Sequence, residues 1–156
     1  MSPTKKAKLS ASLEDYLEAI FNLADESDGA RSKDIAEALG VARSSVTGAF
    51  RLLRERGLAN YEPYGCISLT ESGRAVAAEV VRKHDILTSF FMDVLGVDSD
   101  NAQRAACKAE HALGPEIIGR LLSFVEYVAE CNENGRDVAG EFRRFYQDRG
   151  TAKTER

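Results

Sequence analysis

Residues 32–57 read SKDIAEALGVARSSVTGAFRLLRERG, and local rules assign a structure to most of this stretch. Ser32 is a favoured cap for a short helix that runs to Leu39. Gly40 stands where a left-handed residue ends such a helix, and a second helix is predicted from about Arg43 to Arg56. The stretch therefore predicts two helices joined by a tight turn.

The spacing within this pair is typical of a helix-turn-helix. Ala36 offers a small residue where the helices would cross, Gly40 lies in the turn, and Val46 is an apolar position of the second helix. We therefore expect a helix-turn-helix. The simpler alternative is a helical hairpin that packs for its own sake.

The chain after the second helix predicts a β-hairpin. Residues 58–61 and 66–69 are two short strand-like runs, and the turn Glu62-Pro63-Tyr64-Gly65 separates them. A hairpin directly after a recognition helix is the wing of a winged helix. In such a domain the second helix enters the major groove, and the wing lies along the backbone or the minor groove.

The residues before this motif predict an arm and a first helix. Residues 1–9 carry three lysines without periodicity and predict a mobile basic arm. A helix follows from Ser10 or Ser12 to about Ala24, and Ser12 with Asp15 resembles a capping box. A polar run at 25–29 then breaks the helix.

The second half of the chain predicts helices alone. A long helix opens at Thr70 and ends near Gly96, and Asp98 or Ser99 caps the next helix. A strongly amphipathic helix follows the Gly-Pro pair at 114–115, and a last helix precedes a polar tail. We expect the apolar faces of the helices between about Leu87 and Val128 to form a dimer interface.

Composition bounds the class of protein. The 156 residues are 44% hydrophobic, which suffices for one globular domain or two small ones. The longest apolar run falls short of the roughly 18 residues that span a bilayer, and no signal peptide is evident, so we expect a cytoplasmic protein. Three widely spaced cysteines argue against a disulfide framework.

Charge is unevenly distributed along the chain. The net charge is -4, whereas nucleic-acid-binding domains are usually basic. Residues 31–57, however, hold six basic side chains against three acidic ones, and residues 98–148 hold ten acidic against six basic. The helix-turn-helix could therefore meet phosphate, while the C-terminal half would be repelled by it.

A second motif, Cys107-Lys108-Ala109-Glu110-His111, offers a thiol, a carboxylate and an imidazole on one face of a predicted helix. These are metal-ligand groups, although a partly exposed helix turn would explain the pattern equally well. His84 lies on or beside the buried stripe of the preceding long helix. By itself such a histidine is more often a hydrogen-bonded core residue than a ligand.

Four stretches together resemble the diphtheria-toxin-repressor and manganese-transport-regulator family of metal-dependent transcriptional repressors. They are residues 12–20 (SLEDYLEAI), residues 34–39 with 44–47 (DIAEAL and SSVT), residues 69–74 (LTESGR), and Lys83-His84 followed by Cys107-x-x-Glu110-His111. The resemblance covers nearly all of the folded chain. It implies a mainly α fold: an N-terminal winged helix-turn-helix, then an all-helical dimerisation and metal-binding domain, with no SH3-like third domain.

The expected domains follow from this resemblance. The basic arm occupies 1–9, the DNA-binding domain 10–73, and the dimerisation and metal-binding domain 74–148, with a connecting helix at 74–96. A flexible tail is expected at 149–156.

The resemblance also implies the metal ligands. Glu110 and His111 match ligands shared across the family, and His84 matches the histidine of the preceding long helix. Asp15 and Glu18 match carboxylates of manganese-type members, whereas Cys107 matches the cysteine of iron-type members. The ligand set is thus a hybrid.

This hybrid set leaves two metals in competition. We expect Fe(II) first and Mn(II) close behind, with Co(II), Ni(II) and Zn(II) able to bind in vitro, because a thiolate shifts preference away from Mn(II). Thr88 replaces a further acidic ligand of iron-type members.

For DNA, the resemblance and the motif imply a homodimer on a near-palindromic operator. Arg43, Ser44, Ser45 and Thr47 lie at the end of the recognition helix that reaches base edges, and Arg51 and Arg54 lie nearer phosphates. Gly48 departs from the family pattern, in which many members carry a long polar residue. Methyl contacts and groove shape would then carry more of the discrimination.

Three other functions compete with this one. Cys107 could serve a thiol sensor whose oxidation changes DNA affinity. A hydrolytic metal enzyme would leave the basic helix-turn-helix unexplained and has no substrate-binding loop, so we expect neither catalysis nor a small organic substrate. A plain winged-helix interaction module is the third alternative.

Overall fold

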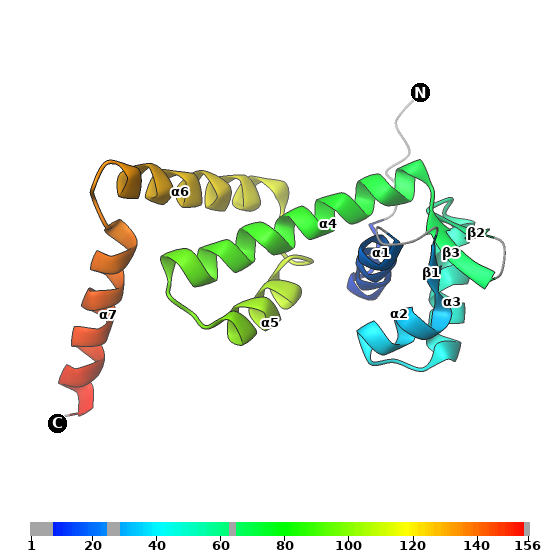
Figure 1. Ribbon diagram of the computed structural model, residues 1–156, viewed down its shortest axis with the longest axis horizontal. Coiled ribbons are helices and arrows are strands. Elements are labelled where there is room, and N and C mark those ends of the chain that lie inside the picture. Colours follow the sequence, from blue (N-terminus) through cyan, green and yellow to red (C-terminus); the bar gives the residue numbers. More distant parts are fainter. Residues whose placement is uncertain (1–7, 25–28, 63–64, 155–156) are drawn as a thin grey trace. The chain divides into compact units, whose positions relative to one another are not determined.

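The computed structural model describes residues 8–24, 29–62 and 65–154. The chain divides into two compact units, Met1–Val81 and Arg82–Arg156 (Figure 1). The division falls within helix α4 (Glu71–Ser89), beyond the boundary predicted at residue 73. The first turns of α4 belong to the first unit because Val76 and Ala77 pack on its core.

Helix α1 (Ala11–Ala24) begins one residue after its cap. The backbone N–H of Leu13 donates to Oγ of Ser10 at 3.3 Å, so Ser10 is the N-cap. The predicted capping box of Ser12 and Asp15 is wrong, because Ser12 already lies in the first turn. The apolar stripe of α1, which includes Leu17 and Ile20, is buried in the core of the first unit.

The helix-turn-helix consists of α2 (Ser32–Leu39) and α3 (Arg43–Glu55). Gly40 ends α2 with φ 65° and ψ 35°, which confirms the predicted left-handed stop. Ser32 is not the cap: it is the first helical residue, and the extended Arg31 precedes it without a side-chain cap. The recognition helix α3 buries one face of its surface in the core, through Val46, Ala49, Phe50 and Leu53.

A three-stranded antiparallel sheet completes the first unit. Strands β2 (Ala59–Glu62) and β3 (Cys66–Leu69) form the predicted wing, with Tyr61 opposite Ile67. A two-residue strand, β1 (Ala30–Arg31), pairs with the other edge of β3 and makes the order β1-β3-β2. Residues 1–7 of the predicted arm, 25–28 of the loop and 63–64 of the hairpin turn lie outside the described residues.

A tight junction joins the wing to α4. The hydroxyl of Thr70 donates to the Gly57 carbonyl at 2.7 Å and accepts from the Gly73 N–H at 3.0 Å. The N–H of Thr70 also donates to the carbonyl of Leu58 at 3.1 Å. A Cβ at Gly73 would lie 1.8 Å from that carbonyl oxygen, so the chain approaches α4 too closely for any other residue.

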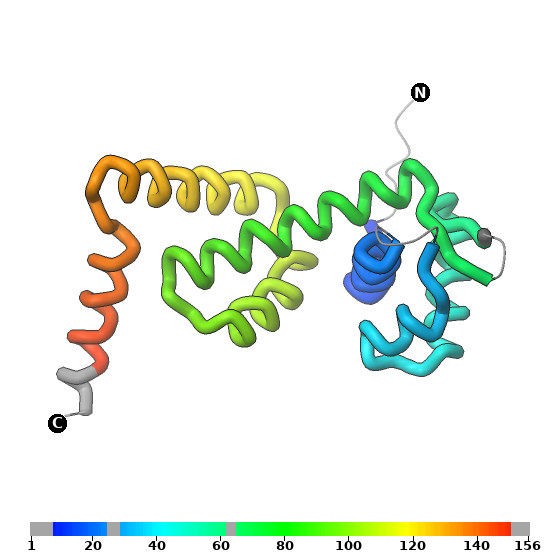
Figure 2. Tube along the Cα trace, in the orientation of Figure 1, coloured from blue at the N-terminus to red at the C-terminus, as the bar shows by residue number. Residues whose placement is uncertain are grey.

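All regular secondary structure in the described part of the second unit is helical. The end of α4 widens into a short π-helix, η2 (Phe90–Val94), in place of the uninterrupted helix predicted to reach about Gly96. Three helices follow, and Figure 2 traces them in order: α5 (Ser99–Ala109), α6 (Pro115–Glu133) and α7 (Val138–Thr154). Helix α7 continues through Gly150, where the sequence predicts a polar tail.

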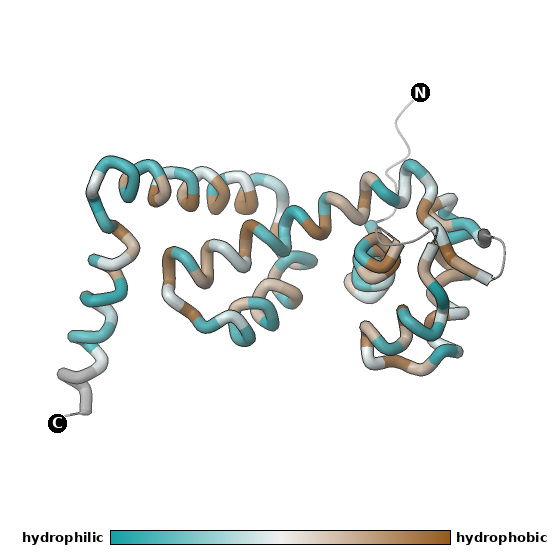
Figure 3. Tube along the Cα trace, in the orientation of Figure 1, coloured by the Kyte–Doolittle hydropathy of each residue, from teal (hydrophilic) through white to brown (hydrophobic). Residues whose placement is uncertain are grey.

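Two small apolar clusters hold this unit together. One joins Ile86 and Leu87 of α4 to α5 and α6, and the other joins Val94 of η2 to α6 and α7. Figure 3 shows the hydrophobic positions of α6 gathered on the side that faces α4. These features confirm a mainly helical fold with a winged helix-turn-helix, and no SH3-like domain occurs among the described residues.

No helix in the described part of the chain combines the length and the apolar character that a membrane span requires.

The junction at Gly73 leads to a stability prediction. We expect Gly73→Ala to lower the free energy of unfolding by about 1–3 kcal/mol, because the new methyl overlaps the Leu58 carbonyl. The matched control is Gly48→Ala in α3, where nothing lies within 4 Å of the added Cβ. That change should raise stability by up to about 1 kcal/mol through helix propensity. Urea unfolding followed by circular dichroism measures both, and equal effects would contradict the close approach.

Candidate metal centre and DNA-binding face

A buried carboxylate marks the candidate metal centre. Glu110 is 1% exposed, and among the described residues it is the one charged side chain that is buried. Its backbone N–H still donates to the Ala106 carbonyl at 2.9 Å, so it continues the geometry of α5 by one residue. An ionised carboxylate is costly to bury unless charged or hydrogen-bonding partners surround it. The groups around Glu110 therefore determine what the centre can do.

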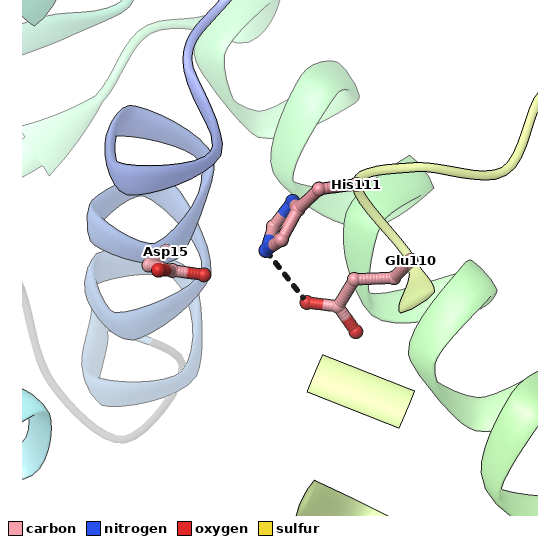
Figure 4. A group of neighbouring side chains, drawn as sticks. All are labelled: Asp15, Glu110 and His111. Atoms are coloured by element: carbon pink, nitrogen blue, oxygen red, sulfur yellow. Dashed lines mark ion pairs between the residues drawn. The ribbon is translucent and has the colours of Figure 1, made fainter. Parts of the chain in front are cut away.

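Two imidazoles face the two oxygens of this carboxylate. Nδ1 of His84, on α4, lies 2.8 Å from Oε2 of Glu110. Nε2 of His111 lies 3.3 Å from Oε1, as Figure 4 shows. The histidine side chains are only 18% and 12% exposed, respectively. His84 is therefore no isolated core histidine, because it pairs with the glutamate that the motif supplies.

The thiol of Cys107 borders the same cluster. Its Sγ lies 3.8 Å from Nδ1 of His84, and the residue is exposed at the end of α5. The prediction that the whole motif lies on one helix face is wrong in part: α5 ends at Ala109, and His111 lies in the turn that follows. The direction of the His111 ring is therefore set by a turn and not by helical periodicity.

Helix α5 is positioned by a well-formed cap. The carboxylate of Asp98 accepts from the Asn101 N–H at 3.0 Å, which identifies Asp98 and not Ser99 as the N-cap. This hydrogen bond from the backbone of Asn101 lowers the pKa of Asp98 below its usual value. Because the folded-state pKa is lowered, the cap contributes above the unfolded pKa and is lost as pH falls through the folded value.

The donor set within the second unit suits a divalent metal. Imidazole nitrogen, carboxylate oxygen and thiolate sulfur are the ligands that first-row transition metals take in proteins. A bound cation would also offset the buried negative charge of Glu110. One turn after His84, the buried hydroxyl of Thr88 has no hydrogen-bond partner among the described residues.

The first unit supplies two further predicted ligands. Asp15, labelled in Figure 4, and Glu18 lie three residues apart on α1 and are partly buried. This spacing places both carboxylates on one face of the helix. Their role as metal ligands stays a prediction.

The predicted DNA-binding residues share the exposed face of α3, opposite the buried face. All six are exposed: Arg43, Ser44, Ser45, Thr47, Arg51 and Arg54. The wing makes a contact with the buried face of α3 that the sequence did not predict. Tyr61 on β2 is about half exposed, and its ring centroid lies 4.2 Å from that of Phe50 on α3. The pairing of β2 with β3 places Tyr61 beside α3. Local sequence rules did not predict this contact because it depends on that pairing, although an aromatic residue in a wing strand is a candidate for such packing.

An exposed basic recognition helix with a wing, followed by a helical unit with a histidine-carboxylate-thiol cluster, defines a winged-helix protein equipped for a divalent metal. Comparison with known proteins agrees. The sequence matches the N-terminal DNA-binding domain of iron-dependent repressors over residues 8–67, and their metal-binding and dimerisation domain over residues 70–138.

Individual proteins show the same likeness. An uncharacterised HTH-type transcriptional regulator of Methanocaldococcus jannaschii is 40% identical over 119 residues, which cover 76% of this chain and 95% of that protein. The crystal structure of T. acidophilum IdeR has a TM-score of 0.65 and 28% identity over 79% of this chain. A manganese-dependent transcriptional repressor in complex with manganese has a TM-score of 0.67 and 32% identity over 74% of this chain.

The match spans about half of these two solved chains, 54% of the first and 53% of the second. With both family domains matched in order, this chain belongs to the iron-dependent repressor family, the group of the diphtheria-toxin repressor and the manganese-transport regulator. The resemblance inferred from the sequence is thereby confirmed.

The geometry at Glu110 leads to a metal-binding prediction. We expect Glu110→Gln, which keeps the shape of the side chain but removes its charge, to weaken Mn(II) binding at least about tenfold. The matched control is Glu116→Gln on α6, whose carboxylate is 77% exposed and pairs with Arg120 one turn later in the same helix. Isothermal titration with Mn(II) measures both, and equal affinities would exclude Glu110 as a ligand.

Proposed function

We propose that this protein is a metal-dependent transcriptional repressor that binds operator DNA as a homodimer when a divalent cation occupies the Glu110 centre. The observation that carries this proposal is the buried Glu110 carboxylate between two imidazoles, in a chain whose recognition helix exposes a basic face. Family membership supports both DNA binding and metal binding, because the matched domains are a DNA-binding domain and a metal-binding and dimerisation domain.

The ligands in this proposal come from both units. His84, Cys107, Glu110 and His111 belong to the second unit, and Asp15 and Glu18 belong to the DNA-binding unit. The first four are supported by their mutual distances, and the last two by their shared face of α1 and by the family resemblance. Ligands drawn from both units would couple the orientation of the DNA-binding unit to metal occupancy.

The charges of these residues explain how such a switch works. Asp15, Glu18 and Glu110 repel one another when they share a site without a counter-charge. A bound cation supplies the positive charge that offsets this repulsion. The residues then hold the DNA-binding units of the dimer so that two recognition helices match successive major grooves. A coupling free energy of about 1–3 kcal/mol corresponds to roughly 5- to 150-fold tighter DNA binding.

Fe(II) is the metal that we favour, with Mn(II) second. The support is Cys107, whose Sγ lies within 3.8 Å of His84 Nδ1, because a thiolate favours the softer metals over Mn(II). The carboxylates and histidines alone would suit Mn(II), and a similar solved protein is described as a manganese-dependent repressor in complex with manganese.

The main test compares DNA binding with and without metal. A duplex library is first selected with the full-length protein and Mn(II), and the affinity for the selected operator is then measured in chelator, in Mn(II) and in anaerobic Fe(II). We expect binding to be about 5- to 150-fold tighter in either metal than in chelator, in line with the coupling above. The same affinity in all three conditions would refute the metal switch.

Paired variants locate the switch. The double change Glu110→Ala with His111→Ala should abolish the metal response while the protein stays a folded dimer by analytical ultracentrifugation. Glu116→Ala with Arg120→Ala removes an exposed ion pair on α6 and should leave the response intact. A metal response that survives the first pair would place the site elsewhere.

The absorption spectrum of bound Co(II) tests whether the Cys107 thiol is a metal ligand. We expect Co(II) bound to the wild-type protein to show a thiolate-to-metal charge-transfer band, and Cys107→Ser to abolish it while Co(II) still binds. Cys131→Ser on α6 is the matched control and should retain the band. An unchanged spectrum for Cys107→Ser would exclude this sulfur from the coordination sphere and would shift the preferred metal to Mn(II).

A further inference from the structure

Beyond Arg43, the exposed positions of α3 near its N-terminal end carry only small side chains. Its exposed positions there include Ser44, Ser45, Thr47 and Gly48. Nothing lies within 4 Å of a Cβ built on Gly48, so the helix surface is open at this point. Recognition helices contact base edges through this end of the helix. Apart from Arg43, any direct contact here must therefore come from small groups and from the backbone.

Thr47 has its hydroxyl turned back to its own helix. Oγ1 of Thr47 donates to the carbonyl of Arg43 at 3.2 Å, one turn earlier. A threonine in this rotamer uses its polar atom locally, as β-branched hydroxyl residues in helices often do. Since the side chain is exposed, its γ-methyl is the group left to meet a partner.

An exposed methyl at this position has a natural partner in DNA. Of the four bases, only thymine presents a methyl group in the major groove, and apolar contact with a threonine methyl is a recognised way to read it. The absence of a side chain at Gly48 removes the atoms that would hold α3 away from the base edges.

We propose that the γ-methyl of Thr47 reads the 5-methyl group of a thymine in each operator half-site, and that Gly48 permits the close approach that this contact needs. The inference rests on the proposed DNA binding and deepens it. Arg43 and Arg51 lie one helical turn before and one turn after Thr47, so Arg43 can reach a base edge and Arg51 a phosphate without displacing the methyl contact.

The test replaces thymine by uracil, which removes only the methyl group. In the selected operator each thymine is changed symmetrically in both half-sites, and affinities are measured with Mn(II). We expect one thymine position at which the change weakens wild-type binding about fourfold per half-site, hence about sixteenfold in all, the equivalent of one buried methyl each.

Two variants assign this effect to Thr47. Thr47→Ser keeps the hydroxyl and loses the methyl, so its affinity should no longer respond to uracil at that position. Thr47→Val keeps a methyl and loses the hydroxyl, so it should respond as the wild type does. Uracil sensitivity that persists in Thr47→Ser, or that vanishes in Thr47→Val, would overturn the assignment. So would the lack of any uracil-sensitive thymine.

Gly48→Ala tests the close approach. The added methyl meets nothing in the protein, so the melting temperature should not fall, but operator affinity should drop about tenfold or more because the helix is held off the bases. Unchanged affinity would refute the role of Gly48. Failure to select any operator would instead contradict the proposed function itself, so the two failures are distinguishable.

Discussion

The candidate metal centre depends on the pairing of a buried carboxylate with two imidazoles. Glu110 is 1% exposed, and its two oxygens face His84 and His111 at 2.8 and 3.3 Å. A carboxylate in such a place is tolerated only with partners of this kind, so the end of α5 must stay in register with α4. The apolar cluster that joins Leu87 to Ala106 and Ile118 holds the same two helices together. Packing and polar pairing thus reinforce one another at the centre.

The first unit meets a different constraint, which is the close backbone approach at the start of α4. Thr70 bonds to the chain just after α3, and Gly73 leaves space for the carbonyl of Leu58. This junction places the wing directly behind the recognition helix, where Tyr61 packs on Phe50. The exposed face of α3 is therefore supported from behind by the sheet and remains open to DNA.

Several features of the fold were predictable because they follow from neighbouring residues. The end of α2 at Gly40, the bounds of α3 and the wing hairpin arise from glycine conformation, periodicity and turn residues. Features that depend on distant partners were missed or misplaced. Strand β1 is too short for a periodic signal and exists only because Ala30 pairs with Ile67. The sequence offered Ser10 or Ser12 as the start of α1, and the hydrogen bond from the Leu13 N–H identifies Ser10, whereas the predicted cap at Ser32 was wrong.

The same distinction between features set by neighbouring residues and features set by distant partners applies to the metal centre. Cys107, Glu110 and His111 stand close together in the chain, and their chemistry made them candidate metal ligands, although an exposed helix turn explained the pattern equally well until the family resemblance was considered. The pairing of Glu110 with His84, 26 residues earlier, arises only when α4 and α5 pack together. Burial of the carboxylate, the end of α5 at Ala109 and the turn that directs His111 likewise come from that packing. Residue type and local spacing define which ligands are available, whereas desolvation and long-range contacts define which of them converge.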